Sequence, residues 1–152
     1  MQESVRELIV QFLAARLEKI QTANGFSVDA TVQRAQLDVD PAGLPAAVIW
    51  DADETADRED FGGSRVTLPV RVELIGEPGT DNPSVYGNRL LRDLRMAVEV
   101  YGDELAKLAE SVVYSRGEIV YPEAGKTVVA VSVVFTIVYL TAKGDPTSRP
   151  FV

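Results

Sequence analysis

Six carboxylates lie within ten residues of one another, and they are the side chains of this sequence best placed to do chemistry. They are Asp51, Asp53, Glu54, Asp57, Glu59 and Asp60. The opening of a calcium-binding loop is imitated by Asp51, Asp53, Thr55 and Asp57. However, Ala56 stands where such a loop needs a glycine for its sharp turn, and Gly62 stands where it needs a bidentate glutamate. We therefore expect no metal site here.

The acidic segment has other interpretations besides metal binding. Residues 51–64 are polar and end in two glycines, which is typical of a long mobile loop between strands. The simplest interpretation is a solvated charged loop. In a ring of subunits the same loop could instead face the central channel and repel passing DNA, or it could dock a basic partner.

Catalysis is a poor interpretation of these carboxylates. The chain contains no histidine and no cysteine, which removes the usual near-neutral base, thiol nucleophiles and common zinc sites. Acid/base work by Asp51 and Asp53 would need a cleft and a desolvated acid. The run Gly62-Gly63-Ser64 lacks the lysine and helix of a phosphate loop. We expect no catalytic residue and no cofactor.

The net charge of −8 is unevenly placed along the chain. Residues 1–81 carry 15 acids and 7 bases, whereas residues 82–152 carry 8 of each. Such a surface repels nucleic-acid phosphates, because binding them requires clustered lysine and arginine. No apolar run is long enough to span a membrane and no signal peptide opens the chain, so we expect a soluble protein of the cytoplasm without nucleic-acid or membrane partners.

Three arginines form the second charged feature. Arg89, Arg92 and Arg95 fall within an arc of roughly 120° on an expected helix, opposite its leucines. Such a row is often only a solvated face. Because the chain also carries the six carboxylates, we hypothesise that the two groups meet, either within the chain or between neighbours.

Two strands look able to join subunits. Residues 128–140 form a run of thirteen positions interrupted only by Ser132 and Thr136, which as a strand would extend about 43 Å. Such a strand must bend, cross to a second sheet or pair beyond its own domain. Residues 66–74 alternate with a period of two, and Pro69 favours an edge strand or a bulge. Alternatively, both strands simply complete the core of a monomer.

The order of elements indicates an α+β fold with a mixed, mainly antiparallel sheet of about five strands and two main helices packed on it. Helices are expected at residues 4–23 and 82–101, with a short continuation at 104–110. Strands are expected at residues 30–39, 46–50, 66–74, 112–121 and 127–141, the last two as a hairpin. Residues 1–142 would form one domain and residues 143–152 a surface tail.

Two aromatic residues invite separate interpretations. Trp50 closes an apolar strand and is expected in the core. Phe151 stands at the end of a proline-rich tail, where it is either disordered or docked on a partner.

Several motifs together resemble one family of phage proteins. These are the helix Leu90-Leu91-Arg92-Asp93-Leu94-Arg95-Met96-Ala97-Val98-Glu99, a strand around residues 113–120, and a long strand that closes in Tyr139, Thr141 and Asp145-Pro146. They resemble the tail terminator family, also called minor tail protein U-like, of long-tailed bacteriophages. The acidic insertion at residues 51–60 and the end at Phe151-Val152 depart from the family's pattern.

The resemblance implies a function in virion assembly. Members of the family form a hexameric ring on the completed tail tube, stop its growth and present the surface on which the head docks. For this chain it implies three partners, namely copies of itself, a tail tube protein and a head–tail connector protein, with DNA passing through the ring. It also implies assembly in the bacterial cytoplasm and a final place at the tail end of a phage or prophage virion. The alternatives are another neck or tail adaptor, or a small non-catalytic protein-binding module.

Overall fold

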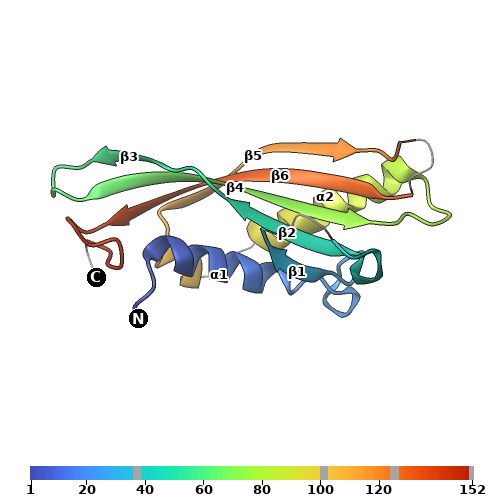
Figure 1. Cartoon of the computed structure of the whole chain (residues 1–152), viewed down its shortest axis with the longest axis horizontal. Helices are drawn as coiled ribbons and strands as arrows, with labels where there is room; N and C mark the ends of the chain where they lie inside the picture. The colour runs from blue at the N-terminus through green and yellow to red at the C-terminus, as the bar shows by residue number, and fades with distance from the viewer. Residues whose placement is uncertain (36–38, 100–102, 124–126, 151–152) are drawn as a thin grey trace.

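The computed structural model describes residues 1–35, 39–99, 103–123 and 127–150 (Figure 1). The described helices are α1 (Val5–Leu17), α2 (Pro83–Glu99) and α3 (Asp103–Ala106), with short 3-10 turns at Thr22–Asn24 and Pro41–Gly43. The described strands are β1 (Thr31–Arg34), β2 (Ala46–Asp51), β3 (Thr55–Arg58), β4 (Ser64–Gly76), β5 (Ser111–Val120) and β6 (Val129–Thr141). The α+β class and the order of the expected elements are confirmed, and β3 is an additional strand.

The described strands form one mixed sheet in the order β1-β2-β4-β6-β5, with β3 paired to β4 beside β2. Only β1 and β2 are parallel; the other pairs are antiparallel. The expected hairpin of β5 and β6 is confirmed, with an irregularity between Tyr114 and Arg116.

Helices α1 and α2 pack on the same face of the sheet and share one hydrophobic core with it (Figure 1). Every second residue of β6 from Val129 to Tyr139 is buried, whereas the intervening ones are only half-buried. Because alternate side chains of a strand point to opposite faces, the second face of the sheet is not covered by these helices. Phe135, which is fully buried, lies at the centre of β6 and contacts the edge of the Tyr114 ring.

Helix α1 begins where the sequence predicts and ends earlier. The Ser4 hydroxyl accepts a hydrogen bond from the Glu7 N–H at 3.0 Å, which caps the helix. After Leu17 the chain turns, and the Ile20 carbonyl accepts a hydrogen bond from the Ala30 N–H at 2.9 Å. This tertiary contact replaces the expected last turn of the helix, and Gly25 adopts a φ of +88° as the chain reverses.

The start of α2 follows the predicted cap. The Asn82 Oδ1 accepts a hydrogen bond from the Ser84 N–H at 2.9 Å, and Pro83 occupies the first helical position. Its buried stripe includes Leu90, Leu94 and Ala97. Tyr101, expected at the end of the stripe, lies outside the described residues.

The two long strands are central, which corrects the expectation that their edges are free. β6 pairs with β4 along its whole length and with β5 for most of it, so no second sheet or partner strand is needed. β4 is likewise internal, so the expectation of an edge strand is wrong, but one side of β4 is unpaired beside Pro69. Pro69 is tolerated because neither β2 nor β3 pairs with β4 at residues 68 and 69.

The acidic segment is not a simple loop. Residues Thr55–Arg58 form β3, which pairs with residues 64–67 of β4. With residues 138–141 of β6, these strands form a projection that we call the β-arm; it extends beyond α1 at one end of the long axis (Figure 1). Thirteen-residue strands extend about 43 Å, whereas α1 and α2 are about 20 and 26 Å long, so the helices leave part of the sheet uncovered.

The chain turns back after β6. The Ala142 N–H donates to the Ser148 carbonyl at 2.8 Å, and the Val5 N–H donates to the Pro146 carbonyl at 2.9 Å. Residues 142–148 therefore lie against the start of α1. In the part of the chain that the structure describes, no helix has the length and apolar character to cross a bilayer.

Candidate functional site

The carboxylates at the base of the β-arm are held by helix α1. Arg6 contacts Asp51 (Nη2 to Oδ2, 3.2 Å) and Glu54 (Nη1 to Oε1, 3.1 Å). The Tyr139 hydroxyl donates to the second Glu54 oxygen at 3.0 Å, and Arg34 lies 3.8 Å from Asp51. The group borders a hollow of about 270 Å³ beneath the arm.

Tyr139 acts only as a hydrogen-bond donor in this group. Burial and the neighbouring Glu54 carboxylate raise the pKa of Tyr139 well above its usual value, so its hydroxyl stays protonated. Every charged side chain of the group is paired with an opposite charge. The arrangement fastens the arm to α1 and offers no unpaired acid or base for catalysis.

The remaining carboxylates of residues 51–60, which lie in or beside the β-arm, differ in whether they are paired. Glu59 accepts a hydrogen bond from Arg65 Nε at 2.6 Å, and Arg65 also contacts Glu110. By contrast, three exposed side chains make no ion pair or side-chain hydrogen bond with any described residue: Asp53, Asp57 and Asp60. We call these three the free carboxylates.

The three arginines lie exposed along α2 and make different contacts. Arg89 lies 3.7 Å from the exposed Asp81. Arg92 donates to the Ser27 hydroxyl at 2.9 Å. Arg95 donates to Glu99 at 3.0 Å, and its guanidinium lies 4.0 Å from the centre of the Tyr114 ring, a cation–π geometry.

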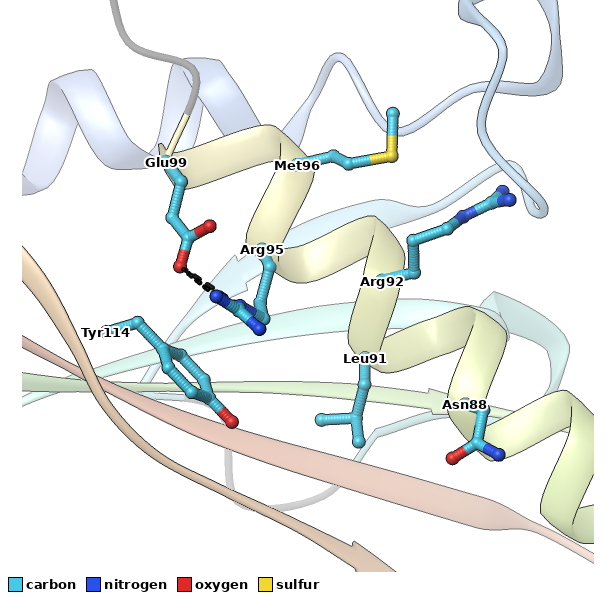
Figure 2. A pocket seen from close by; sticks show the side chains of 7 residues that line it. All are labelled: Asn88, Leu91, Arg92, Arg95, Met96, Glu99 and Tyr114. Atoms are coloured by element: carbon cyan, nitrogen blue, oxygen red, sulfur yellow. Dashed lines mark hydrogen bonds and ion pairs between the residues drawn. The ribbon is translucent and has the colours of Figure 1, made fainter.

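Two of these arginines border a groove of about 460 Å³ between α2 and β5, which we call the α2–β5 groove (Figure 2). Figure 2 shows Arg95 and Glu99 beside Tyr114, Leu91 pointing toward the sheet, and Arg92 extending away from Tyr114. The groove is lined by Asn88, Leu91, Arg92, Arg95, Met96, Glu99 and Tyr114. Its surface is mainly apolar and its charged rim carries both arginines.

The free carboxylates and the arginines do not meet within one chain. None of the ion pairs of Arg89, Arg92 or Arg95 involves residues 51–60. The β-arm lies at one end of the long axis, whereas α2 begins near the other (Figure 1). A contact between the two groups is therefore open only to different copies of the chain, where it stays a prediction.

The sequence does not predict a site role for some residues that organise these surfaces. Arg6 belongs to an amphipathic helix pattern, and Tyr139 and Asp93 appear only in the motifs of the family resemblance. Asp93 is fully buried and accepts a hydrogen bond from the Ser27 N–H at 2.9 Å. Its position between Leu90 and Leu94 on the apolar stripe of α2 was the available signal, because a buried carboxylate needs a partner. Phe151 lies outside the described residues.

Comparisons with known proteins give little direct guidance. No family model matches the sequence, and no curated protein matches it. Among solved structures, the fold is similar to a chain from the virion of a native gene transfer agent particle. That chain is 11% identical, the match covers 93% of this chain and 95% of that one, and the TM-score is 0.41. A similarity at this level carries no functional argument, which must come from the surfaces of the chain itself.

Proposed function

We propose that this chain is a non-enzymatic virion assembly protein, a phage tail terminator that closes into a ring of six copies and caps the tail tube. The observation that carries the proposal is the second face of the sheet. Between residues 130 and 138, the β6 side chains on that face are Ala130, Ser132, Val134, Thr136 and Val138. The water-facing side of an antiparallel sheet is usually polar, yet three of these five side chains are apolar.

Neighbouring residues give this surface a mixed character. Val113 pairs with Thr136 and Val120 pairs with Ala130, so both lie on the same face, and their side chains are 53% and 56% exposed. Between them on that face lie Arg116, paired with Val134, and Glu118, paired with Ser132. Exposed apolar residues bordered by charged ones are typical of a surface that meets another protein. The edge strands β1 and β5 differ in length and direction, which gives the molecule two unlike sides.

Unlike sides suit a closed ring of identical subunits. In such a ring one surface of each copy contacts a different surface of the next, and the rotation between copies closes the circle. One ring face would match the last ring of tail tube protein. The other face would not accept further tube subunits and would receive the head–tail connector, so tube growth stops. The ring would sit at the tail end of the virion after assembly in the host cytoplasm, and DNA would pass through it without specific binding.

The test is the size and shape of the purified protein. We expect native mass spectrometry to show six copies and negative-stain images to show rings. Addition of the protein to tail tube protein during polymerisation is expected to shorten the tubes. A chain that stays monomeric at all concentrations, and does not change tube length, would contradict the proposal. Binding to the tube protein without ring formation would favour the alternative, an adaptor or small protein-binding module.

A further inference from the structure

We propose that the free carboxylates of the β-arm of one copy bind Arg89 and Arg92 of the next copy, where Arg92 lies on the rim of the α2–β5 groove and Arg89 lies just beside it. The proposal rests on the ring described above and names the contact that joins its members. The occupant of the groove is a second copy of this chain.

The acidic side of this contact is preorganised but lacks partners. Asp57 is held in β3, and Asp60 lies in the turn between β3 and β4. The arm is fastened at its base by Arg6 and Tyr139, so the carboxylates project on a paired strand hairpin and not on a loose loop. A hairpin with a fixed shape loses less conformational entropy on binding than a loop does.

The basic side has unused hydrogen-bonding capacity. The side chains of Arg89 and Arg92 are 50% and 54% exposed, and each makes few contacts for its five N–H donors. Arg95 is already engaged by Glu99 and Tyr114, so it shapes the groove. Leu91, which points toward the sheet, and the exposed Met96, which extends from the side of α2 away from the strands (Figure 2), offer apolar surface to the backbone and stems of an incoming hairpin.

Charge and placement make the two surfaces complementary. Carboxylates and guanidiniums form bidentate pairs of defined geometry, which fix the orientation of one copy on the next. The β-arm lies at one end of the long axis, whereas α2 runs from near the other end toward the middle (Figure 1), so a copy that offers its arm to one neighbour can receive the arm of another. This is the head-to-tail relation that a heterologous ring requires.

Two charge-reversed variants test the contact. The arm variant carries Asp57→Lys and Asp60→Lys, and the groove variant carries Arg89→Asp and Arg92→Asp. Each alone is expected to weaken association about tenfold to hundredfold, because like charges then face each other. In an equimolar mixture every arm meets a groove of opposite charge. Native mass spectrometry of the mixture is therefore expected to show rings with equal numbers of the two variants.

Matched controls reverse charges outside the contact. Glu3→Lys with Glu18→Lys, and Lys19→Asp with Lys107→Asp, change net charge by the same amounts at exposed positions and should leave the ring intact. Thermal unfolding checks that each variant folds. If a double variant unfolds, Asp60→Lys and Arg89→Asp replace the doubles, because Asp60 has no described partner and Arg89 contacts only the exposed Asp81.

The outcomes separate this contact from the proposed function. If the wild type forms a ring and both variants form the same ring, the contact is overturned and the proposed ring function still stands. Variants that dissociate but fail to combine in the mixture would also overturn it. A wild-type chain that forms no ring would overturn both proposals.

Discussion

The replacement Asp93→Ala is expected to be among the most destabilising single changes outside the apolar core. Asp93 is fully buried on α2, and its two oxygens accept hydrogen bonds from the Ser27 N–H at 2.9 Å and the Ser27 hydroxyl at 3.3 Å, with a longer contact from Arg92 Nη2 at 3.4 Å. Alanine would remove both acceptors, leave the Ser27 N–H without its partner and open a small cavity.

The expected loss can be worked from these contacts. A hydrogen bond to a charged group contributes about 1.5–3 kcal/mol, and the hydroxyl bond is the longer and weaker of the two. We expect the free energy of unfolding to fall by about 3 kcal/mol. For a domain of this size that corresponds to a decrease of roughly 6–12 °C in Tm.

Urea unfolding followed by circular dichroism measures the effect. Asp93→Asn keeps one carbonyl oxygen for the Ser27 N–H and is expected to lose about half as much. Asp81→Ala, at an exposed position on the way into α2, serves as the control and should change stability by less than about 0.5 kcal/mol. A loss of under about 1 kcal/mol for Asp93→Ala would refute the reasoning that this buried carboxylate holds the loop after α1 onto α2.

Three further predictions concern the core, one close contact and pH. Phe135→Ala should lower the free energy of unfolding by about 3–5 kcal/mol in urea titrations, because it empties the largest fully buried side-chain site. Gly87→Val should lower the free energy of unfolding by about 1–3 kcal/mol, because a Cβ on Gly87 would lie 3.0 Å from Ile119 Cγ2. Gly43→Val is the control, because an added Cβ at Gly43 meets no atom within 4 Å. Hydrogen bonds from Arg34 hold the pKa of Glu7 below its usual value. The stability from this pair is therefore present above the unfolded pKa of about 4.3 and is lost as pH falls through the lower folded value. Glu7→Gln should lower the free energy of unfolding at pH 7 but not in strong acid. A difference in unfolding free energy between wild type and Glu7→Gln that stays constant with pH would contradict this.

Local patterns predicted much of this fold because they act over a few residues. The cap formed by Asn82 and Pro83, the buried stripe of α2 and the alternation of β4 each follow from neighbours in sequence. Such patterns specify which face of an element is buried. They do not specify which strands become neighbours. Pro69 marks an unpaired stretch of β4, but this stretch is a gap between β2 and β3 along an internal strand and not an edge of the sheet.

The acidic segment was harder to predict because its structure depends on distant residues. Nothing in residues 55–58 favours a strand, and their side chains are all exposed. They become β3 because the start of β4 offers them a free edge and Arg6 holds Glu54 at the base of the arm. The candidate site likewise combines residues from α1, the end of β2, the residue before β3 and the end of β6, and no local pattern predicts that they lie close together.

The length of β4 and β6 supports the proposed function, but not through free strand edges as the sequence suggested. Both strands are paired from end to end, so they recruit no partner through their edges. Because they are longer than the helices that cover them, they instead carry the β-arm beyond the helical layer. One face of the sheet also stays free of helices. The additional strand length therefore forms a projecting acidic arm and leaves a partly apolar face without a helical layer, and both are surfaces that another copy or another virion protein can cover.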